Sequence, residues 1–165
     1  MTASTLSQLA ARVSETLRQR GESVSTAESC TGGWIAKTLT DLAGSSALFT
    51  DGFVTYSNAA KTRQLGVDAA LIEQHGAVSE PVVVAMANGA RQRSQADYAI
   101  AVSGVAGPGG GSADKPVGTV WIAWAQADDV RTARYLFAGD RDAIRRLTVE
   151  MALATLDELI NNSPV

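Results

Sequence analysis

The chain has 165 residues, of which 45% are hydrophobic and 19% are charged, the size and composition of one folded domain. One His and one Cys exclude an internal disulfide framework and leave too few ligands for most zinc or iron sites. The net charge of −3 argues against general nucleic-acid binding, and no apolar run approaches the ~18 residues of a bilayer span. We therefore expect one domain over 1–165 without nucleic-acid or membrane partners. We place it in the cytoplasm because the N-terminus lacks the long apolar region of a signal peptide.

Apolar periodicity and turn signals predict helices interleaved with strands. In chain order, the expected elements are a helix over 4–20, a strand over 24–27, a helix over 31–42, a strand over 48–56, a short helix at Leu71 and Ile72, a helix over 79–94, strands over 98–102, 117–125 and 130–137, and a last helix after Asp140. The last two strands are close enough in sequence to form a hairpin. This order predicts a single-domain three-layer α/β/α sandwich with a mixed sheet of about five strands.

The segment 26–33, Thr-Ala-Glu-Ser-Cys-Thr-Gly-Gly, lies between a predicted strand and a predicted helix. Such a turn places side chains at the carboxyl end of the sheet, where open α/β sheets bind ligands. The N–H groups at the start of the helix favour an anion or oxyanion there. Ser29 or Cys30 is therefore positioned like a nucleophile. The alternative is that Ser29 only caps the helix and the glycines only permit close packing.

Tyr56, Asn58 and Lys61 lie at the end of the next predicted strand or just after it, so we expect them at the same edge of the sheet. A lysine desolvated in a pocket loses proton affinity and can act as a general base at neutral pH. The alternative is a surface lysine at the start of a helix. Ser57 and Lys61 are four residues apart, so the segment is not the S-x-x-K signature of penicillin-recognising enzymes.

A glycine-rich loop over 103–112 follows the predicted buried strand 98–102. Five glycines within 104–111 let backbone N–H groups approach a ligand closely, as in phosphate-binding loops. No Gly-Lys-Ser/Thr follows, so this is not a Walker loop. A flexible connecting loop is the equally weighted alternative.

Arginines cluster at the start of the last predicted helix, in 139–146. An acidic protein that binds an anion needs local arginines, whose guanidinium groups suit phosphate. Arg141 and Arg145 are four residues apart and so share one helix face. The alternative is a solvated face of Asp–Arg pairs, which we expect for Arg146.

These four segments, in this order, resemble the CinA C-terminal domain family of bacterial proteins. The residues that carry the resemblance cover most of the chain: TAESCTGG at 26–33, GFVTYSNAAK at 52–61, GAVSEPVV at 76–83, SGVAGPGGGSADKPVGTVW at 103–121 and GDRDAIRR at 139–146. Each motif alone is weak, whereas the ordered set is highly specific. The likeness is to the stand-alone form of the family. Longer members carry a separate N-terminal domain, whose activities we do not expect here.

The resemblance implies hydrolysis of the carboxamide of nicotinamide mononucleotide (NMN) to nicotinate mononucleotide and ammonia, without a metal or other cofactor. By motif, Ser29 is the implied nucleophile and Lys61 the implied base, with Tyr56 nearby. Lys61 would take the Ser29 proton directly or through Tyr56, and N–H groups around Cys30 to Gly32 would stabilise the oxyanion. The residues expected to bind the substrate are Cys30, Thr31, Gly32, Gly33, Asn58, Ser103, Gly104, Gly107, Arg141 and Arg145.

Alternatives stay open at this point. Cys30 is the intrinsically better nucleophile, and only the family pattern favours its neighbour. The domain can also be a catalytically silent nucleotide-binding or regulatory member of the family. A third, weaker interpretation is a self-associating adaptor that uses Trp34, Trp121 and Trp124, although such residues are usually core. In the enzymatic interpretation we expect a homodimer or higher homo-oligomer.

Overall fold

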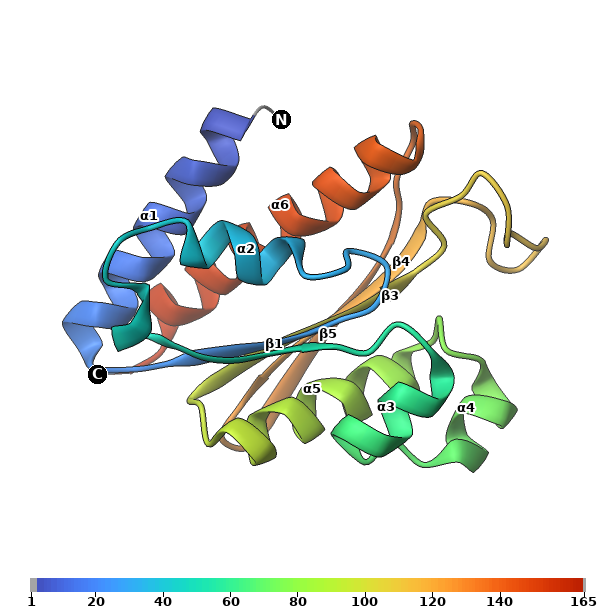
Figure 1. The fold of residues 1–165 in the computed structure, drawn as a ribbon, viewed down its shortest axis with the longest axis horizontal. Helices are drawn as coiled ribbons and strands as arrows, with labels where there is room; N and C mark the ends of the chain where they lie inside the picture. The colour runs from blue at the N-terminus through green and yellow to red at the C-terminus, as the bar shows by residue number, and fades with distance from the viewer. Residues whose placement is uncertain (1–2, 165) are drawn as a thin grey trace.

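The protein, described over residues 3–164 by a computed structural model, forms a five-stranded mixed sheet between two layers of helices (Figure 1). The strand order is β2-β1-β3-β4-β5. The strands are β1 (Val24–Glu28), β2 (Phe49–Val54), β3 (Tyr98–Gly104), β4 (Thr119–Gln126) and β5 (Asp129–Leu136). Strand β1 is parallel to both β2 and β3, and the last two strands form an antiparallel hairpin. The predicted three-layer sandwich and its mixed sheet are confirmed.

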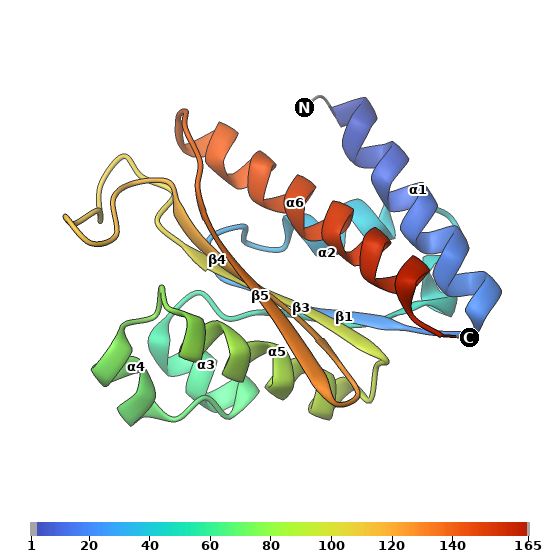
Figure 2. The ribbon, with the colours of Figure 1, turned by 180° about the vertical axis from the view of Figure 1, so that it is seen from behind.

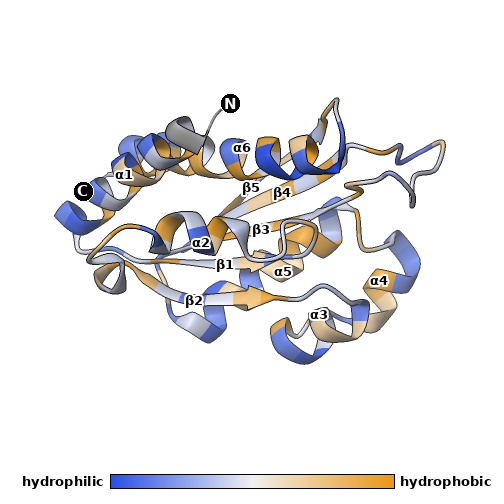
Figure 3. Ribbon diagram, turned by 45° about the horizontal axis from the view of Figure 1, so that its top comes forward, coloured by the Kyte–Doolittle hydropathy of each residue, from blue (hydrophilic) through white to orange (hydrophobic). Residues whose placement is uncertain are grey.

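Helices cover both faces of the sheet, as the front and rear views agree (Figures 1 and 2). One layer holds α1 (Ala3–Arg20), α2 (Trp34–Thr40) and α6 (Arg141–Asn162), and the other holds α3 (Asn58–Leu65), α4 (Ala69–His75) and α5 (Glu80–Ser94). A short 3-10 turn, η1 (Ser45–Ala47), precedes β2. Apolar residues gather mainly on the helix sides that face the sheet (Figure 3).

The two faces of the sheet carry side chains of different size. Along β3, Tyr98, Ile100 and Val102 pack towards α1, α2 and α6, while Ala99 and Ala101 pack towards α5. Alanines on one face let α5 approach the strands closely, since a small side chain leaves room for a helix backbone. Every residue of β1 is buried, as expected for a strand that is covered on both faces.

The register of the parallel strands brings three chain segments together at one edge of the sheet. Glu28, the last residue of β1, pairs with Val54 of β2 and with Val102 of β3. The next residue on each strand therefore lies at the same level. The Ser29 N–H donates to the Val102 carbonyl at 3.1 Å, and the Thr55 N–H donates to the Glu28 carbonyl at 2.9 Å.

Two predicted elements need correction. The segment after β2 forms a complete helix, α3, that the hydrophobic pattern did not indicate. Its caps explain it: the Ser57 Oγ accepts from the Ala60 N–H, and Gly66 ends the helix in the left-handed region. The helix expected over 31–42 is shorter, because residues 30–33 form a turn before α2 begins at Trp34.

Helix α3 is held against α5 by a close backbone approach. A Cβ atom at Gly89 of α5 would lie 2.1 Å from the Leu65 carbonyl oxygen, far inside van der Waals contact. Only glycine therefore permits this spacing of the two helices. The Arg93 side chain adds a hydrogen bond to the same carbonyl at 3.0 Å.

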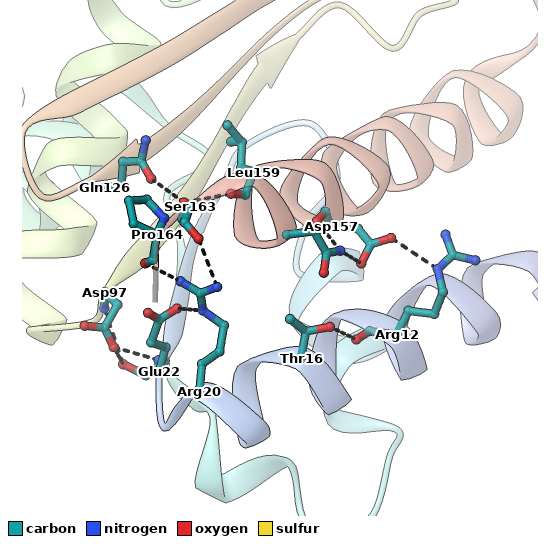
Figure 4. A network of polar contacts seen from close by, with 12 residues as sticks. Arg12, Thr16, Arg20, Glu22, Asp97, Gln126, Asp157, Leu159, Ser163 and Pro164 are labelled. Atoms are coloured by element: carbon teal, nitrogen blue, oxygen red, sulfur yellow. Dashed lines mark hydrogen bonds and ion pairs between the residues drawn. The ribbon is translucent and has the colours of Figure 1, made fainter.

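The end of α6 is tied to the end of α1 and to the end of β4 (Figure 4). Arg20 donates to the carbonyls of Ser163 and Pro164 at 3.2 and 2.9 Å and pairs with Glu22. Trp124 is buried in the core of this layer, where its indole N–H donates to the Ala152 carbonyl. That burial is a structural role and argues against the adaptor interpretation for this residue.

Candidate active site

The turn between β1 and α2 is organised by a buried carboxylate. Glu28 is 1% exposed, and its side chain accepts from the Thr31 hydroxyl at 2.6 Å and from the N–H groups of Ile35 and Ala36 at 2.8 and 3.1 Å. Burial raises the pKa of Glu28, although these hydrogen bonds oppose the shift. Glu28 therefore fixes the start of α2, the capping role that the sequence had assigned to Ser29 as an alternative.

Ser29 and Lys61 meet at the carboxyl edge of the sheet. The Lys61 Nζ lies 3.1 Å from the Ser29 Oγ, within hydrogen-bond distance. It also donates to the backbone carbonyls of Thr55 and Tyr56, at 2.9 and 3.3 Å. The serine comes from the turn after β1 and the lysine from α3, which follows β2. Neighbouring parallel strands thus deliver the two groups to one point.

Lys61 is 1% exposed, so the alternative of a surface lysine is wrong. Burial lowers the pKa of Lys61, because removal from water penalises the ammonium form. All three of its polar partners are uncharged. A neutral amine offers two N–H groups and one lone pair, which match two carbonyls and one hydroxyl. The neutral form of Lys61 can therefore accept the proton of Ser29.

Cys30 is buried beside Ser29. Burial raises the pKa of its thiol to about 12, so the thiol stays protonated at neutral pH. Since the thiolate is the nucleophilic form of cysteine, this environment opposes the role of Cys30 as a nucleophile.

A cavity of about 300 Å³ opens over Ser29 and Lys61. This volume lies at the lower end of the range for small-molecule sites, about 300–1,000 Å³. Nine of the residues expected at the site line it: Ser29, Cys30, Tyr56, Asn58, Lys61, Ser103, Gly104, Gly107 and Arg141. The glycine-rich loop forms one wall, and the turn at Ala77 and Val78 forms another.

Arg141 closes one side of the cavity mouth. It donates to the Gly107 carbonyl at 2.7 Å and to the Tyr56 hydroxyl at 3.0 Å. Tyr56 is 59% exposed, and its hydroxyl accepts from Arg141, whereas its backbone carbonyl accepts from Lys61. Of the two proton routes left open by the sequence, the geometry favours direct transfer from Ser29 to Lys61.

Four expected substrate-binding residues lie outside this cavity. Thr31, Gly32, Gly33 and Arg145 line a separate surface hollow of about 530 Å³. Arg145 reaches the turn from that side, where it donates to the Cys30 carbonyl at 3.0 Å and the Thr31 carbonyl at 3.2 Å. The sequence placed Arg141 and Arg145 together, but Arg141 contacts Gly107 and Tyr56, whereas Arg145 contacts the turn after β1.

Comparison with known proteins places this arrangement in a family. A sequence profile of the CinA C-terminal domain matches residues 6–160. The chain belongs to the CinA C-terminal domain family. A relative from Escherichia coli, "Nicotinamide-nucleotide amidohydrolase PncC", is 59% identical over 94% of this chain and 95% of its own length. A Pseudomonas putida relative of the same name is 57% identical over 92% and 93%.

Solved structures of CinA proteins share the fold. The competence/damage inducible protein CihA from Agrobacterium tumefaciens superposes with a TM-score of 0.92 at 46% identity, and the alignment covers 96% of each chain. The two structures are alike over almost the whole chain, in agreement with the profile match over residues 6–160.

Sequence reasoning about this CinA-family chain missed several groups that build the site. The Thr55 carbonyl holds Lys61, and Ala77 and Val78 form a cavity wall. Glu28, whose side chain accepts from N–H groups at the start of α2, was not among the predicted site residues. Its position as the last residue of a buried strand, just before Ser29, was the available signal. The carbonyl and the small wall residues carry no comparable signal.

The described chain was also searched for metal-binding clusters and for membrane-spanning helices. Within residues 3–164, no three His, Cys, Asp or Glu side chains gather as metal ligands would. No helix in that range is long and apolar enough to cross a membrane. His75 ends α4 and contributes its carbonyl to a hydrogen bond from Lys115 at 2.8 Å.

Proposed function

We propose that this protein hydrolyses the carboxamide of NMN to nicotinate mononucleotide and ammonia. The observation that carries the proposal is the buried Lys61 Nζ, 3.1 Å from the Ser29 Oγ, at the base of a cavity of small-molecule size. The names of the 57–59% identical relatives support the same substrate and reaction. The reaction belongs to the recycling of pyridine nucleotides, and the cytoplasm is the compartment that this proposal predicts.

The proposed reaction begins when neutral Lys61 takes the Ser29 proton as the Oγ attacks the carboxamide carbon. The resulting ammonium of Lys61 then protonates the amide nitrogen, the carbon–nitrogen bond breaks, and ammonia leaves a nicotinoyl ester on Ser29. Water attacks that ester while Lys61 takes its proton. Return of the proton to the Ser29 oxygen frees the serine and releases nicotinate mononucleotide. The positive pyridinium ring of the substrate disfavours a nearby ammonium, so bound substrate favours the base form of Lys61.

Backbone N–H groups of the turn are the proposed oxyanion donors. The Gly32 N–H is already engaged by the Ser29 carbonyl at 3.1 Å, whereas the Thr31 N–H makes no hydrogen bond within residues 3–164. Of the residues Cys30 to Gly32, Cys30 lines the cavity and the other two do not, so the Cys30 N–H is the donor that this proposal favours. Such donors stabilise the negative charge that develops on the carboxamide oxygen in the transition state.

Arg141 and the glycine-rich loop are the proposed phosphate site. Arg141 lines the cavity, and the residue as a whole is exposed. The N–H groups of Gly107, Gly109 and Gly110 make no hydrogen bond within the described part of the chain. Free N–H groups in a glycine-rich loop and one arginine are the groups that bind a phosphate dianion.

Release of ammonia from NMN by the purified protein tests the proposed reaction. Turnover supports it, and tight NMN binding by calorimetry without ammonia would support the silent nucleotide-binding interpretation instead. If the protein neither releases ammonia nor binds NMN, the adaptor interpretation is the one that remains. The expected homodimer or higher oligomer is a separate prediction, which sedimentation of the full chain checks.

The Cys30→Ala variant is expected to hydrolyse NMN at a rate within about threefold of the wild type. Its thiol is protonated at neutral pH, so the substitution removes packing volume and no reacting group. Steady-state ammonia release checks this. A rate loss comparable to that of a Ser29 variant would transfer the nucleophile role to Cys30.

The Arg141→Gln variant is expected to raise the KM for NMN by about 10-fold or more, since a charge-assisted hydrogen bond contributes about 1.5–3 kcal/mol. Nicotinamide riboside lacks the phosphate and is the internal control, so its KM is expected to stay nearly constant. Equal losses on the two substrates would contradict the assignment of Arg141 to the phosphate.

A further inference from the structure

Two walls of the proposed substrate cavity come from segments without regular secondary structure. One is the β3–β4 loop (105–118), which includes the glycines of 107–111, and the other is the turn at Ala77 and Val78 between α4 and α5. The spacing of such walls depends on contacts that other groups provide, since no helix or strand ladder fixes their backbone. Lys115, which the proposed mechanism does not use, connects the two segments.

Side chains hold the turn between α4 and α5 at three successive carbonyls. Each carbonyl accepts from a different element: His75 from Lys115 at 2.8 Å, Gly76 from Ser79 at 2.7 Å, and Ala77 from Ser103 at 2.9 Å. The last carbonyls of a helix lack partners inside it, and a cation there also interacts favourably with the helix dipole. The half-buried Lys115 satisfies both conditions at the end of α4. Of the three donors, it alone belongs to the β3–β4 loop.

The effect of Lys115 reaches the cavity because the β3–β4 loop packs tightly on itself. Val117 lies two residues after Lys115 and contacts the glycines on the other arm of the loop. A Cβ atom at Gly107 would lie 2.4 Å from the Val117 Cγ1, and one at Gly111 would lie 2.9 Å from the Val117 backbone nitrogen. The glycines thus permit this close approach of the two arms. Since Gly107 lines the cavity, a tie at Lys115 restrains the segment that faces the ligand.

Other cationic side chains hold the same loop. The Arg134 guanidinium of β5 donates to the Asp114 carbonyl at 2.7 Å, directly before Lys115, and Arg141 donates to the Gly107 carbonyl on the other arm. Hydrogen bonds from charged donors are stronger than those between neutral groups. Of these three contacts, the one made by Lys115 is to the opposite wall of the cavity.

We infer that Lys115 is a positioning residue, which ties the β3–β4 loop to the turn at Ala77 and Val78 and so keeps the loop N–H groups where they bind the substrate phosphate. This inference rests on the phosphate site of the proposed function and deepens it. A loop that adopts its binding-competent arrangement only part of the time binds its ligand more weakly, in proportion to that fraction. Ser29 and Lys61 lie on other elements and, within the described residues, make no hydrogen bond to the loop. Lys115 therefore acts on binding and not on the chemical step.

The test measures kcat and KM of the Lys115→Met variant on NMN and on nicotinamide riboside. Methionine keeps an unbranched, flexible side chain and removes the ammonium, so the loop loses its tie to the turn. The KM for NMN is expected to rise by about 5–10-fold, the effect of a competent fraction of about one-tenth to one-fifth. The KM for the riboside, which has no phosphate, and kcat on both substrates are expected to change by less than about twofold.

Lys115→Arg is expected to keep the KM for NMN within about threefold of the wild type, since a guanidinium can donate to the same carbonyl. The matched control is Lys37→Met, the same substitution at an exposed lysine that pairs with Asp41, and it is expected to leave all constants unchanged. Thermal unfolding of every variant separates weaker binding from misfolding. If Lys115→Met fails to fold, Lys115→Gln keeps a polar end, is too short for the tie, and is expected to raise the KM for NMN in the same way.

Three results with an active wild type overturn this inference alone. They are unchanged constants in a folded Lys115→Met variant, a loss confined to kcat, and equal rises of KM on the two substrates. A wild type that releases no ammonia refutes the proposed reaction, and calorimetry of NMN binding then decides this inference. It is supported if Lys115→Met weakens NMN binding by about 5–10-fold, and it is refuted if the affinity is unchanged or the wild type does not bind NMN.

Discussion

The Ser29→Ala variant is expected to hydrolyse NMN at least about 10³-fold more slowly than the wild type, because it lacks the oxygen that would form the acyl intermediate. Ser29 is buried at the base of the cavity, and the Lys61 Nζ is 3.1 Å from its Oγ. The removed hydroxyl is small and its turn is held by Glu28, so the fold is expected to persist. Single-turnover ammonia release gives the rate, and thermal unfolding checks the fold.

Ser112→Ala is the matched control, since this serine lies on the exposed part of the glycine-rich loop. It is expected to retain activity. Rapid acid quench of the wild type, followed by mass spectrometry, is expected to show a nicotinoyl adduct on the peptide that contains Ser29. An active Ser29→Ala enzyme, or an adduct on Cys30, would reverse the assignment of the nucleophile.

The Lys61→Met variant is expected to lose NMN hydrolysis by about 10²–10⁴-fold, the usual contribution of a general base. It is also expected to be more stable than the wild type at neutral pH. Lys61 is 1% exposed and has no charged partner, so its ammonium form carries an uncompensated desolvation cost. The gain is expected because this desolvation cost disappears with the amine, and the two carbonyls that lose their donor offset part of it.

The pH dependence of both effects follows from the lowered pKa of Lys61. Between that lowered value and the ordinary pKa of lysine, the folded chain binds fewer protons than the unfolded chain, so the contribution of this group to stability increases with pH. The stability advantage of Lys61→Met is therefore largest at low pH and shrinks as the pH rises towards the ordinary value. For the wild type, kcat is expected to rise with pH as Lys61 loses its proton.

Chemical denaturation and initial rates across a pH series measure these trends. Lys37→Met is the matched control, because Lys37 is an exposed lysine paired with Asp41 on α2. It is expected to change neither activity nor the pH dependence of stability. A Lys61→Met variant that is inactive and less stable than the wild type at every pH would contradict the picture of a buried, neutral base.

The sequence predicted the strands and most helices of this fold well, because apolar periodicity and turn residues are local signals. The continuous apolar run at 98–102 became the central strand β3, and the two strands near the C-terminus paired as a hairpin. Helix α3 was missed because NAAKTRQL has little apolar periodicity, and tertiary packing against Gly89 compensates for that. The local caps at Ser57 and Gly66 were the signals that could have predicted it.

The sequence predicted which residues lie at the site better than it predicted the contacts that they make. Ser29, Lys61 and the glycine-rich loop were assigned to one edge of the sheet, and the structure brings them together. The separation of Arg141 from Arg145 was beyond the sequence. Residues four apart share a helix face, yet they are displaced by about 6 Å along the axis. One therefore reaches the cavity mouth, while the other reaches the far side of the turn.

The pairing of β1 with β2 has a consequence for how this domain can vary. The turn that carries Ser29 and the helix that carries Lys61 leave the sheet from adjacent, hydrogen-bonded strands, so the sheet itself sets the separation of this proposed catalytic pair. The walls that would select a substrate come from elsewhere, namely the long loop after β3, the turn at Ala77 and Val78, and the first turn of α6. Reactivity and selectivity thus occupy different parts of the chain. Loops can diverge to admit another amide while the bond-breaking chemistry stays intact.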